Sequence, residues 1–309
     1  MEGTNVKKRR YNKKNIIRIA VMVICAMVFA VCIVNILKIL YEYIESENYY
    51  EELNRGFDYS PANVANGFSI LPMTGYGAAD PLGNYINQKN SPGDIHIEKP
   101  SGDYVVLPGN AEFRLMTAKL REYYSQNSDV YGYIQIDDTK ISYPIMQGTD
   151  NDFYLSHGLN KRYLKVGSIM TDYRNSRTIT ENRNLIIYGH NMLNGSMFHD
   201  LARFDKDLHR DAEAFFRSHD EIVVSTFDGI YTFKIFSFYH TDDEDPYLVI
   251  NFFSDAEFLE YCNTAIDRSM YNTGISIGKD DIVLTLSTCV NGKPTERYAC
   301  HAKLVSIQK

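Results

Sequence analysis

The stretch DIVLTLSTCVNGKPTERYACHAKLVSI (281–307) decides the fold. Its two halves alternate between the two faces of a strand with a period of two, which is typical of half-buried β-structure. Asn291-Gly292 and Pro294 separate the halves with strong turn-forming chemistry. Two strands joined by so short a loop are expected to be antiparallel neighbours.

Cys289 ends the first of these strands, on the face opposite Leu284 and Leu286. A structural cysteine more often lies with the apolar residues, as the alternation predicts for Cys300. Arg297 begins the second strand and is expected close to Cys289, where a guanidinium favours a thiolate and binds a developing oxyanion. The pattern indicates a thiol nucleophile, and an inert thiol is the alternative.

A thiol nucleophile needs a base, and the chain contains eight histidines. His190 ends the run NLIIYGH (184–190) and precedes a loop, where catalytic side chains are common. His199, His209 and His219 lie in a charged, helical-looking region and are expected to be solvated. His190 is therefore the candidate acid/base.

The pattern of the chain from about residue 110 onward is mostly β with α additions. Strand-like runs occupy 130–136, 141–146, 167–172, 184–190, 221–229, 230–240, 281–289 and 296–307, and helical spacing marks 111–127 and 255–270. Many short strands with one or two helices predict a closed β-barrel of about eight strands. The expected additions are an N-terminal helix and a helical insert before the cysteine strand.

Residues Ile19 to Leu37 form an apolar run whose only strongly polar member is Asn35. As a helix this run measures about 28 Å, enough to cross the hydrocarbon core of a bilayer. Seven basic residues precede it and several glutamates follow it. The positive-inside rule then predicts an uncleaved signal anchor with a cytoplasmic N-terminus and an external remainder.

Charge and cysteine usage exclude other classes of protein. The chain carries a net charge of −7, and because residues 1–40 carry +7, the remainder carries −14. An acidic body argues against a nucleic-acid partner, since phosphate binding needs a basic face. The external cysteines are Cys262, Cys289 and Cys300, an odd number that leaves at least one thiol unpaired within the chain. No C-x-x-C spacing supports a zinc site.

Several motifs resemble those of sortases, the cysteine transpeptidases of Gram-positive bacteria. Thr285 to Cys289 (TLSTC), followed by Arg297, is similar to the TLxTC…R signature of that family, and Tyr188 to Met192 (YGHNM) resembles its histidine loop. The similarity is closest to class B and covers roughly residues 110–309. The runs that support this class are 130–136, 150–158 and 167–175, the serine in TLSTC, and the helical insert.

The resemblance implies a sortase β-barrel and a two-step transpeptidation without a cofactor. Cys289 would attack the threonine carbonyl of an NPxT- or LPxTG-like sorting signal, with His190 as acid/base and Arg297 on the oxyanion. The acceptor would be the amine of a peptidoglycan precursor or of a pilin. Ser287, Thr288 and Tyr247 are expected to contact the substrate.

The expected organisation has four parts. They are a basic cytoplasmic tail (1–15), a transmembrane anchor (16–40), an extracellular stalk (41–108) and the catalytic domain (109–309). The stalk carries Leu71-Pro72-Met73-Thr74-Gly75, itself a match to LPxTG. It could act as a lid or as a self-substrate, or be a coincidence.

Alternatives remain open at this stage. A pilin-polymerising sortase and a hydrolytic cysteine endopeptidase of the same fold are the alternative functions. The acidic residues 242–245 are expected to form a solvated loop, and calcium binding there is the alternative, so no metal site is predicted. A wall-anchored adhesin would carry its LPxTG motif before a C-terminal span, and the order here is the reverse.

Overall fold

The computed structural model describes residues 13–54, 95–98, 104–107 and 111–308. The chain divides into two compact units, one ending at Glu45 and the other beginning at Ser46. The first unit holds most of helix α1 (Lys13–Asn54), and the second holds the last turns of α1 and all the strands.

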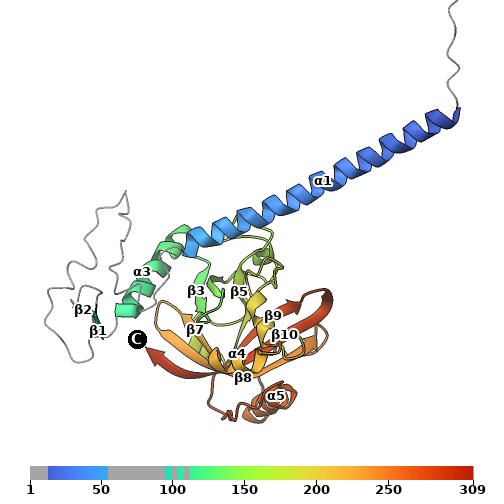
Figure 1. Cartoon of the computed structure of the whole chain (residues 1–309). Helices are drawn as coiled ribbons and strands as arrows, with labels where there is room; N and C mark the ends of the chain where they lie inside the picture. Colours follow the sequence, from blue (N-terminus) through green and yellow to red (C-terminus); the bar gives the residue numbers. More distant parts are fainter. Residues whose placement is uncertain (1–12, 55–94, 99–103, 108–110, 309) are drawn as a thin grey trace, which may run out of the picture. The chain divides into compact units, whose positions relative to one another are not determined.

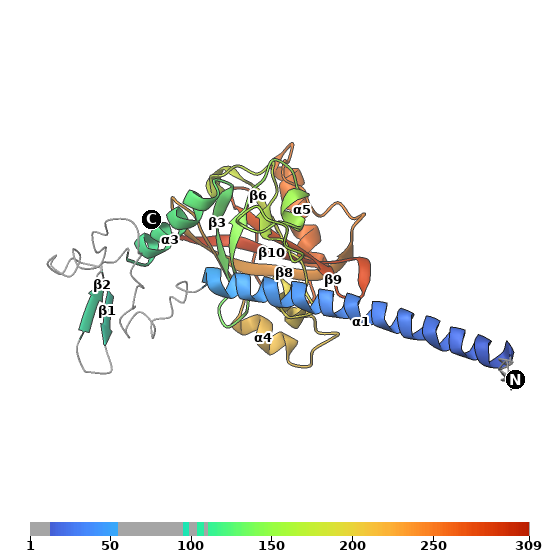
Figure 2. The same cartoon turned by 90° about the horizontal axis from the view of Figure 1, so that it is seen from above.

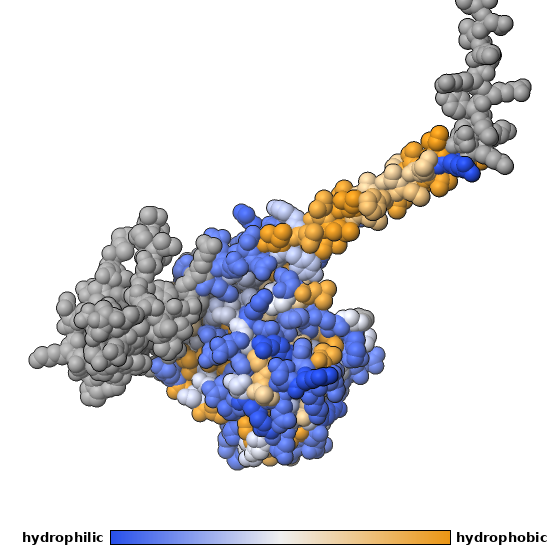
Figure 3. All heavy atoms as spheres, in the orientation of Figure 1, coloured by the Kyte–Doolittle hydropathy of each residue, from blue (hydrophilic) through white to orange (hydrophobic). Residues whose placement is uncertain are grey.

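Helix α1 carries apolar side chains on all sides from Ile19 to Ile33. Its large side chains from Ile17 to Leu40 are exposed, and Figure 3 shows them as a continuous hydrophobic surface. Within the described residues, it is the one helix long and apolar enough to cross a membrane. A helix of this length without a polar face matches the hydrocarbon core of a bilayer in length and composition.

Eight strands of the second unit close into a barrel, in the order β10-β8-β7-β3-β4-β5-β6-β9 (Figure 1). The strands are β3 (Val130–Gln135), β4 (Ser142–Met146), β5 (Ile169–Thr171), β6 (Asn184–Tyr188), β7 (Glu221–Ser225), β8 (Ile230–Asp242), β9 (Val283–Val290) and β10 (Lys293–Gln308). Each of the eight strand-like runs in the sequence becomes one of these strands. The predicted closed barrel is confirmed.

The barrel is mixed rather than purely antiparallel. β4 pairs with β5, and β6 with β9, in parallel, while the other neighbours are antiparallel. A parallel pair needs a long crossover, and the connection from β6 to β9 contains β7, β8 and two helices. Figure 2 shows β8, β9 and β10 side by side, with β6 close by.

Helices cover parts of the barrel. The longer ones are α3 (Ala111–Gln126), α4 (Ala212–Ser218) and α5 (Asp255–Arg268), and three 3₁₀ turns are η1 (Phe153–Leu155), η2 (Ile179–Glu181) and η3 (His199–Phe204). Helix α5 is the predicted insert before the cysteine strand. Ser254 caps it, because its hydroxyl accepts the backbone N–H of Glu257. Its buried face packs in one apolar cluster with residues of β8, β9 and β10.

The region predicted as a stalk contains two strands that the sequence analysis missed. β1 (Ile95–Glu98) and β2 (Tyr104–Leu107) form an antiparallel hairpin. Each has only four residues, too few for a period of two to stand out among the Gly, Pro, Asn and Ser around them. The motif Leu71–Gly75 lies outside the described residues.

The last turns of α1 pack against the barrel. The Tyr50 hydroxyl donates to the carbonyl oxygen of Gly167 over 2.5 Å, and the Tyr133 hydroxyl donates to Asn54 Oδ1 over 3.0 Å. The Tyr123 hydroxyl bonds the Leu53 carbonyl. These contacts attach residues 46–54 to the same compact unit as the barrel.

Candidate functional site

Cys289 lies at the exposed end of β9. It is the only exposed residue of that strand, and its side chain alternates with Leu284 and Leu286, which belong to the barrel core. Cys289 therefore lies on the outer face of the barrel wall, where a reagent can reach its Sγ.

The other thiols of the barrel unit have opposite surroundings. Cys262 lies on the buried face of α5 and Cys300 in the barrel core, and both are fully buried. Burial raises the pKa of Cys262 to about 12 and that of Cys300 further still. Because the thiolate is the nucleophile, burial makes these two groups inert, and Cys289 alone of the three is accessible.

Arg297 lies directly opposite Cys289 in the antiparallel pair of β9 and β10. This is the neighbour relation predicted from the short loop between the two strands. The guanidinium donates to the Glu296 carbonyl oxygen over 3.0 Å and to Asp243 Oδ2 over 3.2 Å. An ion pair and a backbone acceptor thus hold a partly buried cation on the face of Cys289.

His190 reaches the site from the other side of β9. It follows β6, the parallel neighbour of β9, and the Gly189 backbone N–H donates to the Ser287 carbonyl oxygen over 3.2 Å. The His190 imidazole Nε2 lies 2.9 Å from the Leu155 carbonyl oxygen. A carbonyl only accepts, so Nε2 carries the hydrogen, and in the neutral ring Nδ1 is the nitrogen that can take up a proton.

The three expected substrate contacts have different positions. Ser287 lies on the same face of β9 as Cys289, and its hydroxyl bonds the Tyr247 hydroxyl over 2.7 Å. Burial raises the pKa of Tyr247, and the positive charge of Arg297 opposes that shift. Thr288 alternates to the opposite face and is 3% exposed, with no hydrogen-bond partner found for its Oγ1. The substrate role of Thr288 stays a prediction that its side-chain position does not support.

Three other histidines have hydrogen-bond partners away from the Cys289 thiol. His301 is fully buried between the Tyr239 hydroxyl and the Thr285 hydroxyl, and burial lowers its pKa to about 3. His240 Nε2 lies within hydrogen-bond distance, 2.7 Å, of Oδ2 of the buried Asp205. His199, expected to be solvated, instead contacts Asn191. Of these four histidines, His190 is the one in the loop after β6, whose backbone bonds β9 two residues before Cys289.

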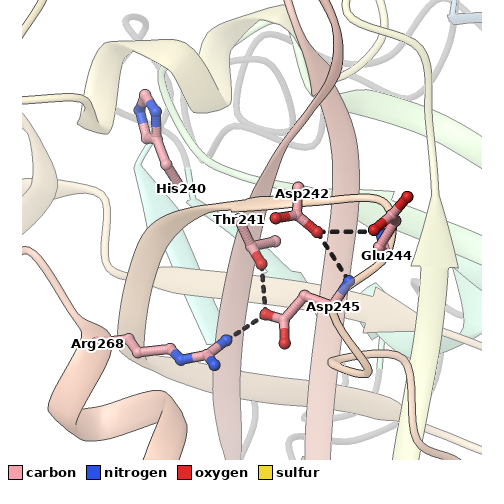
Figure 4. Close-up of a pocket in the computed structure, with 6 residues that line it drawn as sticks. All are labelled: His240, Thr241, Asp242, Glu244, Asp245 and Arg268. Carbon is pink, nitrogen blue, oxygen red and sulfur yellow. Dashed lines mark hydrogen bonds and ion pairs between the residues drawn. The ribbon is translucent and has the colours of Figure 1, made fainter.

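Asp242 and Asp245 of the acidic loop form hydrogen bonds with other groups of the protein (Figure 4). Asp245 receives the Thr241 hydroxyl and the Arg268 guanidinium, and Asp242 Oδ1 accepts the backbone N–H of Glu244 and Asp245 over 3.0 and 2.9 Å. These residues and His240 surround a shallow hollow. Across the described part of the chain, no group of three or more acidic, His or Cys side chains could hold a metal ion.

Three contacts at the site were missed by the sequence analysis. The Leu155 carbonyl oxygen accepts a hydrogen bond from His190 Nε2, and Asp243 forms an ion pair with Arg297. The Asn191 side chain donates to the carbonyl oxygen of Cys289. Asn191 follows His190 directly, so its proximity to the site was visible. The partners were not, because they depend on which strands the barrel brings together.

Comparison with known proteins decides the family. The model of the sortase domain family matches residues 134–305, more than half of the chain. The chain belongs to the sortase family. Sortase B of Listeria monocytogenes is 36% identical over 191 residues, which cover 61% of this chain and 74% of that protein. Sortase B of Staphylococcus aureus is 29% identical over 183 residues, covering 59% and 72%.

Solved structures agree with this family and with class B. Clostridium perfringens sortase B superposes with a TM-score of 0.55 at 30% identity, covering 60% of this chain and 99% of that one. A Bacillus anthracis protein similar to sortase B gives a TM-score of 0.55 at 35% identity, with 62% and 84% covered. A Staphylococcus aureus sortase B–substrate complex gives 0.56 at 27% identity, with 62% and 86% covered.

Proposed function

We propose that this sortase is a membrane-anchored cysteine transpeptidase that cleaves a sorting signal after threonine and transfers the acyl group to an amine. The observation that carries the proposal is the strand order β6-β9-β10. In this order β9 carries Cys289 between β10, which carries Arg297, and β6, whose following loop carries His190, and the Cys289 thiol is exposed.

The first step forms a thioester. His190 takes the thiol proton of Cys289, Sγ attacks the threonine carbonyl carbon, and the Arg297 guanidinium stabilises the tetrahedral oxyanion. When the C–N bond breaks, His190 gives a proton to the departing amine. The N-terminal part of the peptide remains as a thioacyl group on Cys289, and the C-terminal part leaves.

The second step reverses these roles. An incoming amine loses a proton to His190 and attacks the thioester carbonyl, which expels the Cys289 thiolate and forms a new amide bond. A peptidoglycan precursor or a pilin lysine supplies the amine, and water in its place would give hydrolysis. Ser287 and Tyr247, whose hydroxyls are joined on the face of Cys289, contact the bound signal.

The substrate is a secreted protein with an NPxT- or LPxTG-like pentapeptide. One structurally similar protein, Staphylococcus aureus sortase B, has been solved as a substrate complex, which supports substrate binding by this sortase as well. Residues 16–40 anchor the enzyme as a single-pass signal anchor with the N-terminus in the cytoplasm. The exposed apolar surface of α1 and the basic residues before it support this topology.

A panel of peptides tests the proposal. The full-length chain in detergent micelles would be incubated with fluorogenic NPQTN-, SPKTG- and LPMTG-type peptides, with and without an amine. We expect cleavage of one peptide, with amine diverting the product to a new amide. Cys289→Ala should abolish turnover, and Arg297→Lys should lower kcat by about 100-fold, as loss of an oxyanion donor does.

A matched thiol provides the control. Cys262→Ala removes a sulfur from the buried face of α5, and this variant should cleave the same peptide as the wild type. Equal cleavage by Cys289→Ala and the wild type would refute the proposal. So would the absence of cleavage together with failure of iodoacetamide to label Cys289.

A further inference from the structure

Two asparagines beside the proposed catalytic residues are bonded to each other. Asn191 directly follows His190, and Asn291 lies two residues after Cys289. Asn291 Nδ2 donates to Asn191 Oδ1 over 2.9 Å, and Asn191 Nδ2 donates to the Cys289 carbonyl oxygen over 3.0 Å. One carboxamide thus joins the loop of His190 to the end of the strand that carries Cys289.

The bond to Cys289 continues the ladder between β6 and β9. The last backbone bond of that parallel pair runs from Gly189 N–H to the Ser287 carbonyl oxygen. The next carbonyl on the same edge of β9 lies two residues further along, at Cys289. Because β6 ends at Tyr188, the Asn191 side chain supplies the donor that the backbone no longer provides. His190 is therefore held between two hydrogen bonds to β9.

The carboxamide of Asn191 has one orientation that satisfies all its partners. Its Oδ1 accepts Asn291 Nδ2 and also lies 3.0 Å from His199 Nδ1, which must carry the hydrogen because an amide oxygen only accepts. A flipped amide would place Oδ1 against the Cys289 carbonyl oxygen and lose these bonds. The surroundings therefore fix Nδ2 toward Cys289.

We propose that Asn191 is a positioning residue for the transpeptidation, holding the backbone of His190 in place relative to Cys289, and that Asn291 acts through it. The inference rests on the function proposed above. A reacting group displaced by about 1 Å can lose roughly 100-fold in rate. Asn191 thus acts on turnover and leaves the affinity for the peptide unchanged.

Steady-state kinetics of the full-length chain in micelles test this, with the peptide that the wild type cleaves. We expect Asn191→Ala to lower kcat by about 10- to 100-fold with KM within about two-fold, and with an unchanged unfolding temperature. Asn191→Asp should have a kcat as low as that of Asn191→Ala or lower, because a carboxylate oxygen then faces the Cys289 carbonyl oxygen. Asn291→Ala should lower kcat by a smaller factor. In the double variant with Asn191→Ala, it should lower kcat almost no further.

A control variant and a substrate-independent readout separate the possible failures. Asn272 is an exposed asparagine whose Oδ1 accepts the Gly274 N–H over 3.1 Å, and Asn272→Ala should behave as the wild type. The rate of Cys289 alkylation by iodoacetamide would also be followed against pH. In Asn191→Ala, the pH dependence of the alkylation rate is expected to shift toward the pH dependence seen in His190→Ala.

The outcomes discriminate between the two proposals. A wild type that neither cleaves peptide nor reacts at Cys289 would refute the proposed function, and this inference with it. An active wild type whose kcat and alkylation profile are matched by Asn191→Ala would overturn the positioning role alone. A rise in KM at constant kcat would overturn it as well, because it would make Asn191 a residue of substrate binding.

Discussion

At the scale of single residues, surroundings give identical side chains different chemistry. Cys289 is exposed at a strand end, whereas Cys262 and Cys300 are buried with raised pKa values. The same contrast separates two histidines. His190 lies on the loop after β6, and His301 is sealed beneath α5 with its pKa lowered by burial. Period-two alternation predicts the side of the strand for both cysteines of β9 and β10.

The buried imidazole of His301 predicts a dependence of stability on acid. Burial, with a smaller effect from Arg268, lowers its pKa from 6.5 to about 3. The unfolded chain therefore takes up a proton first as the pH falls. The stability that His301 contributes is fully present above about pH 6.5 and is lost as the pH falls toward 3.

Urea unfolding at pH 7.5 and pH 4.5 checks this dependence. The wild type should lose free energy of unfolding between the two values, and His301→Gln should lose less. His209→Gln, at an exposed histidine, should keep the loss of the wild type. Equal losses in His301→Gln and the wild type would show that His301 does not titrate differently on folding.

At the scale of elements, the strands were predictable and their partners only partly so. All eight barrel strands and α5 follow from local periodicity, and a short loop fixes the β9–β10 pair. The parallel contact of β6 with β9 joins residues almost a hundred positions apart, and no local pattern encodes it. For that reason the position of His190 before a loop and the family resemblance made it the candidate acid/base, but neither could foresee its contact with Leu155 or the bond from Asn191 to Cys289.

The loop between β4 and β5 predicts a glycine requirement. Gly167 has φ +56°, and a Cβ there would lie 2.4 Å from the Leu155 carbonyl oxygen, the group that accepts His190. Gly167→Ala should therefore lower the free energy of unfolding by about 3 kcal/mol or more, from backbone strain and from the clash together. Its kcat should fall as well, because Leu155 must move.

Gly274 provides the matched comparison. Its φ is +70°, but a Cβ there would meet no atom within 4 Å. Gly274→Ala should cost only the backbone strain, about 1 kcal/mol, and leave kcat unchanged. Thermal unfolding and peptide turnover of the two variants check the difference, and equal effects would remove the steric argument for Gly167.

At the scale of the whole molecule, one chain combines an apolar helix with an acidic barrel unit. Residues 1–40 carry the basic charge and the remainder is acidic, so a helix long and apolar enough to cross a membrane was predictable from composition alone. The barrel unit begins at Ser46, and the last turns of α1 belong to it through Tyr50 and Asn54. Single side-chain hydrogen bonds of this kind leave no periodic signal, so the sequence predicted a stalk there.

Mass spectrometry of the intact full-length chain, quenched in acid during turnover of its sorting peptide, tests the central claim most directly. We predict a mass increase equal to the N-terminal fragment of the peptide, located on Cys289 and removed by hydroxylamine, which cleaves thioesters. The adduct should be absent from Cys289→Ala. Turnover without any adduct on Cys289, or an adduct on another residue, would contradict a thioacyl intermediate at this site.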